Sequence, residues 1–515
     1  MKLKPSPQQQ AFLDWIEKGT GSAVIEAVAG SGKTTTLIMG LEKTEGTVAF
    51  MAYNRAVADE IGKRIASLNL GGRVKSGTVH SFGSVSLRNA YPLSVKGSDK
   101  KTDDKNKIKM IADKVVDKKG YVFFAKLAAS MAKQVGLGVY CDINDAEEWA
   151  NMISHHSLAD VLPDYADLSK GISYAQEILR VNNLNVKKVY DFDDMVYIPV
   201  LENLEMKKYD WIFLDEAQDT NLVRRELAKR MLTPNGRLVA VGDSHQAIYG
   251  FTGADSRSMG KISEELNCIH LPLTVSYRCP KKVVSTANQW VSHIEAAKDA
   301  PDGIVDSCDI DTLIKNSEFS EKDVILCRKT KPLVELAFNL IRAGIPCKVE
   351  GRSIGTGLAS ITRKWKVSTV RDLEFKLKDW RAREIEKAVK RGDYSRCDYI
   401  DDQVETLGVM MDECKPNDSI ETLVGKINSF FKDSENGQAT ILTLSTIHRA
   451  KGKEWDRVFV LDMDKHSPSR WAKKPWELEQ ETNLCYVQVT RAKKHLTFMH
   501  SDPPHKEKGS NRYEF

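Results

Sequence analysis

Short apolar runs alternate with helix-length amphipathic segments along most of this chain. The runs at residues 23–26, 47–52, 211–214 and 237–243 are largely apolar, which is typical of strands buried on both faces of a sheet. An amphipathic segment at residues 8–18 comes before the first of them. Because strands that alternate with helices usually pair in parallel, the pattern predicts an α/β fold with a parallel sheet.

The same alternation resumes in the second half of the chain and implies a second parallel sheet. Its predicted strands cover residues 323–328, 344–351, 439–444, 457–462 and 495–500. Its predicted helices cover residues 285–297, 331–343 and 481–493.

Two more polar, helical stretches interrupt the alternation at residues 88–188 and 352–436. The first contains a charged low-complexity run that we interpret as a solvated loop, and the second contains a charged amphipathic helix at residues 370–390. We therefore expect two α/β domains, each with a mainly helical inserted subdomain. Their predicted extents are 1–87 with 189–268 for the first domain, and 269–351 with 437–515 for the second.

Composition narrows the class of protein without identifying a function. The 515 residues are 41% hydrophobic and 29% charged, with a net charge of +5, which permits nucleic-acid binding but does not argue for it. The nine cysteines form no CxxC pair, so zinc ribbons and iron–sulfur clusters lack their usual ligand spacing. There is no apolar signal core and no apolar run of membrane-spanning length, so we expect a cytoplasmic protein.

Residues 27–36, AVAGSGKTTT, lie between a predicted strand and a predicted helix, as a phosphate-binding loop requires. Glycines let the backbone turn tightly and aim N–H groups at a polyphosphate, and the helix N-terminus adds partial positive charge. Lys33 can reach the terminal phosphates, and the Thr34 hydroxyl can bind Mg²⁺. The alternative is a chance glycine-rich turn. The predicted nucleotide-binding residues here are Ala29, Gly30, Ser31, Gly32, Lys33, Thr34 and Thr35.

A second element, WIFLDEAQDT, makes that alternative much weaker. An apolar strand ends in Asp215 and Glu216. Asp215 is placed to hold Mg²⁺, and Glu216 is placed to orient and deprotonate the attacking water. Together with the phosphate loop, the two carboxylates predict hydrolysis of a nucleoside triphosphate.

Four further residues are candidates for the same site, and two of them have a simpler alternative. Gln8 can read adenine through its amide, or it can be a polar helix start. Gln246 follows a strand and can sense the γ-phosphate. Arg278 is a candidate arginine finger, with a surface salt bridge as the alternative, and Arg491 is a second candidate contact to the γ-phosphate.

Several polar and aromatic residues follow predicted strands, where open α/β sheets bind ligands. They can hold phosphates or stack on bases, although helix capping or core packing is the favoured explanation of each residue taken alone. The candidates for contact with nucleic acid from this reasoning are Tyr53, Asn54, Arg55, Thr78, His80, Phe82, Tyr249 and Phe251.

The complete set of motifs resembles superfamily 1A DNA helicases of the UvrD/PcrA/Rep type. AGSGKTT, YNRAVADEI, TVHSF, DFDDM, DEAQDT, VGDSHQAIYGF, SYR, STIHRAKGKEW and YVQVTRAKKHL occur in family order over almost the whole chain. The wording of YNRA and IHRAKGKEWD is closer to the F-box DNA helicase branch, although we find no F-box. Such a free-standing core fits a phage or bacterial source.

The resemblance implies two RecA-like P-loop domains with ATP and Mg²⁺ in the cleft between them. Lys33, Thr34, Asp215, Glu216 and Gln246 would act from the first domain, and Arg278, Glu454 and Arg491 from the second. Tyr277 would stack on adenine. Thr446 and His448 would join Thr78, His80, Tyr249 and Phe251 along a track for single-stranded DNA.

The chain also departs from the family pattern. The family's aromatic after the second strand falls on Ala52, its FRGA reads Phe251-Thr252-Gly-Ala, and Gln488 replaces a small residue before the final Thr-Arg. The second insertion is short. We expect these departures to leave hydrolysis intact and to affect step coupling and duplex unwinding.

The resemblance therefore implies an ATP-dependent helicase that moves 3′→5′ on single-stranded DNA and unwinds duplex in replication, recombination or repair. Its partners would be single-stranded DNA, junctions with duplex, and recombination or repair proteins, with no membrane. It would lie at the nucleoid, or in the host cytoplasm if phage-encoded. The alternative is a DNA-stimulated ATPase that displaces proteins from DNA with little unwinding.

Overall fold

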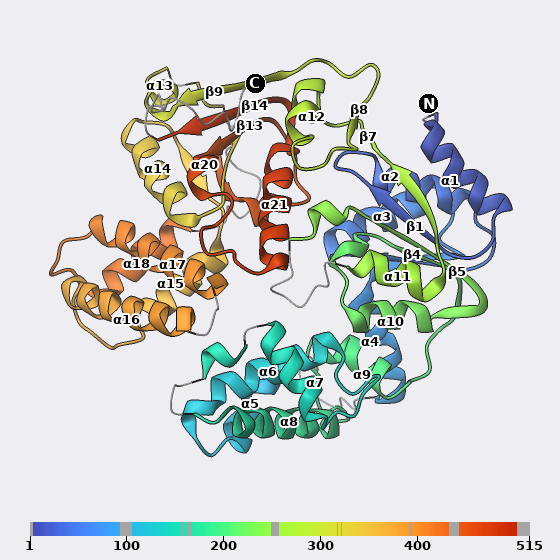
Figure 1. Ribbon diagram of the computed structural model, residues 1–515, viewed down its shortest axis with the longest axis horizontal. Coiled ribbons are helices and arrows are strands. Elements are labelled where there is room, and N and C mark those ends of the chain that lie inside the picture. Colours follow the sequence, from blue (N-terminus) through green and yellow to red (C-terminus); the bar gives the residue numbers. More distant parts are fainter. Residues whose placement is uncertain are drawn as a thin grey trace. The chain divides into compact units, whose positions relative to one another are not determined.

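The computed structural model describes residues 4–92, 106–156, 158–162, 166–248, 257–316, 318–320, 322–390, 394–431 and 442–501. The chain divides into two compact units, Met1–Thr274 and Val275–Phe515. Each unit is built on one six-stranded sheet (Figure 1). In the described part of the chain, no helix has the length and apolar character needed to cross a membrane.

The sheet of the first unit has the strand order β3-β2-β4-β5-β1-β6, and every neighbouring pair is parallel. This confirms the parallel α/β sheet predicted from the apolar runs. The strands are β1 (Ala23–Ala27), β2 (Val48–Ala52), β3 (Val74–Thr78), β4 (Tyr209–Leu214), β5 (Leu232–Gly242) and β6 (Ile269–Leu273).

Both faces of this sheet are covered by apolar side chains from helices. On one face, Phe12, Leu37 and Ile61 pack with Ile25 and Phe213 in one buried cluster. On the other face, the buried cluster extends outward into the inserted helices. The helices that carry the chain between and beside the strands are α1 (Pro7–Lys18), α2 (Lys33–Lys43), α3 (Arg55–Ser67), α4 (Val79–Ala90), α9 (Asp194–Leu201), α10 (Leu222–Arg230) and α11 (Ser258–Leu266).

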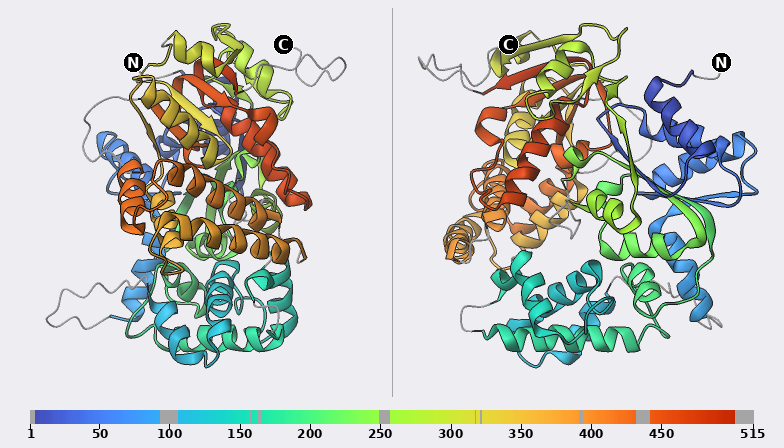
Figure 2. Two further views of the ribbon diagram at one scale, coloured as in Figure 1. Left: turned by 90° about the vertical axis from the view of Figure 1, so that its left-hand side faces the viewer. Right: turned by 45° about the vertical axis from the view of Figure 1, so that its right-hand side comes forward.

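Four inserted helices form a separate group beside this sheet (Figure 1; Figure 2). They lie within the stretch 88–188 that the sequence marks as an insertion. They are α5 (Lys107–Val115), α6 (Val122–Val135), α7 (Ala146–His155) and α8 (Leu168–Leu184). Their buried residues, such as Phe124 and Trp149, belong to the same cluster as Met51 of β2, so the insertion and the sheet share one core.

A buried polar network fixes the inserted helices to the start of α9 and to the residues just before it. Lys133 of α6 donates to Asp191 at 2.6 Å and to Asp194 at 3.0 Å. Lys107 of α5 donates to Asp194 at 2.6 Å, and Asn182 of α8 donates to it at 2.8 Å. Burial by itself lowers the pKa of Lys133, but Asp194 and Asp191 outweigh it and raise that pKa. Lys133 is therefore charged and paired inside the protein.

The second unit has the sheet order β11-β12-β10-β13-β14-β9, again parallel throughout. This confirms the second parallel sheet. Its strands are β9 (Ile304–Asp309), β10 (Val324–Cys327), β11 (Cys347–Val349), β12 (Leu442–Thr446), β13 (Trp455–Leu461) and β14 (Ala492–His500). The helices outside the insertion are α12 (Lys281–Ala287), α13 (Ile310–Lys315), α14 (Thr330–Arg342), α19 (Ile447–Ala450), α20 (Met463–His466) and α21 (Pro475–Val489).

The inserted helices of the second unit pack on its sheet through a single buried cluster. Leu377, Ile400 and Leu423 of the insertion belong to the same cluster as Ile325 and Leu444 of the strands. The inserted helices are α15 (Arg352–Thr362), α16 (Val370–Lys390), α17 (Tyr394–Asp412) and α18 (Ile420–Phe430). The insertion is therefore continuous with the core of its own unit.

Two boundary predictions are wrong. The second domain does not begin at 269, because Ile269–Leu273 (β6) pairs with β1 in the first sheet. The predicted helix 285–297 is also wrong, because α12 ends at Ala287 and Glu295–Ala296 (β8) pairs with Val275–Ser276 (β7). Val291 and Ile294 are buried at helical spacing although they lie outside a helix, which explains the error.

The polar network gives a first prediction. Replacing Lys133 with Met leaves the carboxylates of Asp191 and Asp194 buried without their shared ammonium group. We expect the free energy of unfolding to fall by about 3–5 kcal/mol, measured by chemical denaturation. The control is Lys126→Met on the same helix, where the ammonium lies over the Phe123 ring and a loss of about 1 kcal/mol or less is expected. Equal losses in the two variants would contradict the role assigned to Lys133.

Candidate nucleotide and nucleic-acid sites

The phosphate-loop residues form a tight turn between β1 and α2. Gly30 and Gly32 have φ angles of 75° and 80°, in the left-handed region that glycine adopts without strain. Helix α2 begins at Lys33, and its N-cap, Gly32, provides no side-chain hydrogen bond. A helix start of this kind presents backbone N–H groups to an anion. Thr34 and Thr35 lie in its first turn.

Helix α1 supports this loop through a residue that the sequence analysis overlooked. Gln9 donates to the Thr36 hydroxyl at 2.9 Å, and that hydroxyl donates to the Gly32 carbonyl at 2.9 Å. Gln9 also completes the capping box of α1 with Ser6. The spacing of Ser6 and Gln9 is a signal for the capping box, but it does not predict the contact of Gln9 with Thr36. The hydroxyl of Ser31 is buried in the loop without a hydrogen-bond partner among the described residues.

The two carboxylates directly follow β4 and lie beside the phosphate loop. Asp215 is 5% exposed, and its Oδ1 accepts a hydrogen bond from the Glu216 N–H at 3.0 Å. Lys33 Nζ lies 3.9 Å from Glu216 Oε2. Burial and the neighbouring Glu216 raise the pKa of Asp215 to about 7, against the opposing charge of Lys33. The structure thus brings the two predicted motifs together.

A chain of hydrogen bonds links Glu216 to the candidate γ-phosphate sensor. Gln218 donates to Glu216 Oε2 at 2.5 Å and accepts from the Asp243 N–H at 3.2 Å. Gln246 donates to Asp243 Oδ2 at 2.6 Å. Gln218 was not among the predicted site residues, although it stands within the DEAQD motif. The loops that follow β4 and β5 are therefore joined through side chains.

The side-chain amide of Gln8 is hydrogen-bonded to Thr274 in this structure. It donates to the Thr274 hydroxyl at 2.8 Å and accepts from the Thr274 N–H at 2.9 Å. Both ends of the amide are engaged, so reading of adenine by Gln8 stays a prediction.

The second unit gathers three predicted residues at the amino ends of β13 and β14. Arg278 donates to Glu454 at 2.6 Å and to the Thr490 carbonyl at 3.4 Å. Arg491 is 1% exposed and donates to the carbonyls of Val487 and Lys453 at 2.9 and 3.3 Å. It lies in the turn between α21 and β14 rather than in the predicted helix.

Tyr277, the candidate adenine-stacking residue, is 54% exposed. It directly precedes Arg278, which pairs with Glu454. An exposed phenol ring beside these groups is compatible with stacking on a base, and its role stays a prediction.

Most candidates for contact with nucleic acid in the first unit lie at the carboxyl ends of β2 and β3. Tyr53 and His80 line one small recess together with Asp215, Glu216 and Arg224. The recess therefore joins the predicted track to the carboxylates.

Three further candidates lie close in the sequence to residues that line this recess. Asn54 and Thr78 cap α3 and α4 by accepting from Val57 N–H and Ser81 N–H, which confirms the capping alternative for both. The guanidinium of Arg55 is exposed and lies 3.7 Å from Asp59.

Phe82 cannot stack on a base, contrary to prediction. Its side chain is 5% exposed and packs edge-on against Tyr209 at 6.0 Å between ring centroids. It follows His80 by two positions on α4 and so faces the core. The predicted residues Tyr249 and Phe251 lie outside the described residues.

Phe192 is an exposed aromatic that the sequence analysis overlooked. It is 53% exposed and stacks on His80, with ring centroids 3.8 Å apart and an interplanar angle of 15°. Its neighbour Asp191 belongs to the buried network with Lys133. Burial and the charge of Arg224 lower the pKa of His80 to about 3, so His80 is neutral at physiological pH. The only signal in the sequence is the aromatic residue within the DFDDM motif.

Thr446 and His448 lie where β12 ends and α19 begins. Thr446 is the N-cap residue of α19, and His448 lies inside that helix. Burial lowers the pKa of His448 to about 3, with smaller contributions from Arg328 and Lys451. Both residues are at the carboxyl edge of the second sheet.

Comparison with known families gives two matches that together cover most of the chain. A model described as the UvrD/REP helicase N-terminal domain matches residues 7–267. A model described as the UvrD-like helicase C-terminal domain matches residues 360–502.

Individual relatives are distant in sequence. ATP-dependent DNA helicase Rep of Escherichia coli is 25% identical over 57% of this chain and 44% of Rep, so the chain spans less than half the length of that relative. A probable DNA helicase II homolog of Mycoplasma genitalium is 23% identical over 93% of this chain and 83% of the homolog. DNA helicase II of Haemophilus influenzae is 22% identical, with 94% and 82% covered.

The stack of Phe192 on His80 gives a second prediction. Replacing Phe192 with Ala exposes the imidazole to water, so the pKa of His80 should rise from about 3 towards its ordinary 6.5, by about one unit or more. Because that pKa is depressed, the stability that neutral His80 contributes is present above pH 6.5 and lost as the pH falls towards 3. The variant should lose less stability over that window.

The measurement is an NMR titration of the His80 ring. Phe123→Ala is the control, because Phe123 is an exposed aromatic on α6 whose ring lies under the Lys126 ammonium group. An unchanged His80 titration in Phe192→Ala would show that the stack does not shield the ring.

Proposed function

This chain belongs to the UvrD/REP helicase family, and on that premise we propose that it is an ATP-dependent DNA helicase that moves 3′→5′ on single-stranded DNA and unwinds duplex. The observation that carries the proposal is the approach of Lys33 to Glu216, with Glu216 linked through Gln218 and Asp243 to Gln246. In this proposal, the phosphate-loop lysine, the candidate base and the phosphate sensor act together.

In this proposal, Lys33 and the N–H groups at the start of α2 hold the terminal phosphates of ATP. Glu216 orients and deprotonates the attacking water. The oxygen donors of Thr34 and Asp215 fit Mg²⁺, which prefers few protein ligands beside substrate phosphates. When bound, the ion neutralises charge on the transferred phosphoryl group.

The second unit contributes Arg278 and Arg491 to the γ-phosphate. Both guanidiniums lie at the amino ends of neighbouring strands, and Glu454 holds Arg278. Tyr277 stacks on adenine and Gln8 reads its edge after releasing Thr274. Arginines in such positions accelerate phosphoryl transfer by about 10³–10⁵.

Single-stranded DNA is the proposed track. Tyr53, His80 and Phe192 offer ring faces or edges near the recess of the first unit, and Thr446 and His448 offer polar groups at the second sheet. Stacking on aromatic rings tolerates any base sequence, which suits a motor. Tyr249 and Phe251 extend the track by resemblance. We propose a cytoplasmic protein at the nucleoid that acts in replication, recombination or repair.

A third prediction concerns ATP hydrolysis. Lys33→Ala removes the ammonium that reaches the terminal phosphates, so DNA-stimulated hydrolysis should fall by about 10³ or more in a phosphate-release assay. Lys43→Ala at the other end of the same helix is the control, since Lys43 pairs with Glu17 at the surface. Near-normal hydrolysis by Lys33→Ala would refute the proposed site.

A fourth prediction concerns direction. Matched duplexes with a 3′ tail, a 5′ tail or no tail should be unwound with a clear preference for the 3′ tail, and the rate should fall steeply with salt because phosphate contacts release counterions. A preference for the 5′ tail would overturn the proposed polarity. DNA-stimulated hydrolysis without unwinding would favour a motor that displaces proteins from DNA, with Thr252 and the short second insertion as the first residues to examine.

A further inference from the structure

The second unit has two groups of candidate functional residues, and they lie at opposite ends of its parallel strands. We call these the carboxyl edge and the amino edge of the sheet. Its strands are parallel, so all carboxyl ends lie at one edge. Cys327 of β10 pairs with Thr446 of β12 there, which places Arg328, the next residue, beside the candidate track residues. At the other edge, Trp455 of β13 pairs with Ala492 of β14, so Glu454 and Arg491 lie at the amino ends.

Helix α21 connects these two edges. It lies between β13, which ends at the carboxyl edge, and β14, which begins at the amino edge. Glu481 lies within this helix, and ten residues at a rise of about 1.5 Å each place it about 15 Å from Arg491. The helix is thus a rigid rod between the two groups of candidates.

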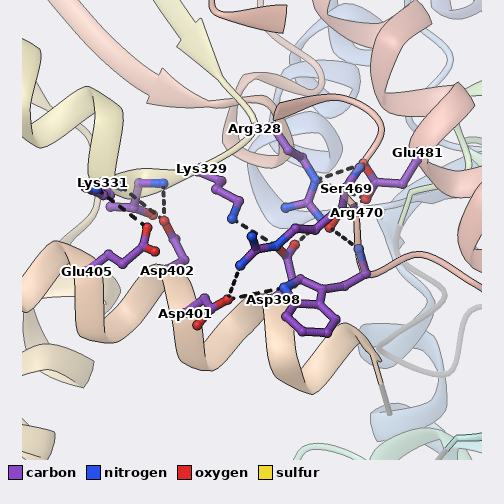
Figure 3. Close-up of polar contacts among 12 residues, drawn as sticks. Arg328, Lys329, Lys331, Asp398, Asp401, Asp402, Glu405, Ser469, Arg470 and Glu481 are labelled. Atoms are coloured by element: carbon purple, nitrogen blue, oxygen red, sulfur yellow. Dashed lines mark hydrogen bonds and ion pairs between the residues drawn. The ribbon is translucent and has the colours of Figure 1, made fainter. Parts of the chain in front are cut away.

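Arg328 holds the first half of α21 through a forked ion pair. Its Nε donates to Glu481 Oε1 at 3.0 Å and to Oε2 at 3.2 Å, and its terminal nitrogen donates to Oε1 at 2.7 Å. Both side chains are largely buried, and Figure 3 shows them pointing toward each other. Fork-shaped arginine–carboxylate pairs fix orientation as well as distance.

The insertion supplies a second carboxylate to Arg328. Asp398 of α17 lies 3.1 Å from the guanidinium and 3.3 Å from Lys329 Nζ. The same helix caps α14, because Asp402 Oδ1 accepts from the Thr330 and Lys331 N–H groups (Figure 3). Arg328 therefore joins three elements, namely β10, α17 and α21.

The far end of α21 holds the candidate γ-phosphate contacts. The Thr490 carbonyl accepts from Arg278, and Arg491 Nε donates to the Val487 carbonyl. Any shift of α21 along its axis therefore changes the positions of both arginines together.

We propose that Arg328 is a positioning residue that couples the DNA-facing edge of this unit to Arg278 and Arg491 through Glu481 and α21, with Asp398 of the insertion holding it in place. The inference rests on the proposed function. It assigns to the short second insertion a role in transmission that needs no contact between the insertion and DNA.

The test measures coupling between the two ligands, which is reciprocal by linkage. Binding of a fluorescent non-hydrolysable ATP analogue with Mg²⁺ is titrated with and without oligothymidylate, for the full chain and for Arg328→Lys, Glu481→Gln and Asp398→Asn. Glu421→Gln is the matched control, because Glu421 pairs with Arg363 at the surface of the same insertion. Thermal melting and ATP turnover are followed in parallel.

In the unaltered protein, DNA should tighten analogue binding by about fivefold or more. In Arg328→Lys and Glu481→Gln that factor should fall to about one, while analogue affinity and hydrolysis without DNA stay within about twofold. Asp398→Asn, which keeps the forked pair, should lie between them and the control. Combining the first two substitutions should add no further loss, because both break one link.

Three outcomes would overturn the inference. Variants that keep the coupling of the unaltered protein would show that the pair transmits nothing. If a variant loses affinity for the analogue in the absence of DNA to the same degree as it loses coupling, the pair has a merely structural role. If Arg328→Lys and Glu481→Gln fail to fold, Asp398→Asn provides this comparison. If the unaltered protein shows neither coupling nor DNA-stimulated hydrolysis, the proposed function itself fails.

Discussion

Two adjacent carboxylates at the end of a buried strand need positive charge beside them, and the first unit is arranged to supply it. Only β5 separates β4 from β1 in the sheet, so the phosphate loop and the carboxylates lie about 10 Å apart at one edge. Lys33 crosses that gap to Glu216. The pKa of Asp215 is still raised, because the carboxyl group is buried and lies beside Glu216.

Hydrogen bonds extend this arrangement beyond the carboxylates. Gln218 links Glu216 to the loop after β5. Gln9 binds Thr36 of α2, whose hydroxyl in turn donates to the Gly32 carbonyl in the phosphate loop. The second unit uses the same principle, since the Thr490 carbonyl and Glu454 hold Arg278. Polar side chains that position other polar side chains are thus as prominent as the predicted catalytic residues.

The sequence was sufficient for the parallel sheets and the two motifs of the first unit, because continuous apolar runs and glycine-rich turns are local signals. It was insufficient where burial depends on distant neighbours. Phe82 and Phe192 are both aromatic and both lie near His80. Phe82 is buried because its position on α4 faces the core, whereas Phe192 is exposed because it lies in a turn. Likewise, β6 could be assigned to the first sheet only from its pairing with β1.

Each insertion shares a hydrophobic core with its own sheet, and this limits how the sequence can change in evolution. A module joined to its host by two crossing linkers can be exchanged with little effect on either partner. Here Trp149 and Leu423 belong to the same buried clusters as the strands of their units, and Asp402 completes a helix of the host. Each insertion is therefore tied to its own sheet by complementary packing, and substitutions on the two sides must be acquired together.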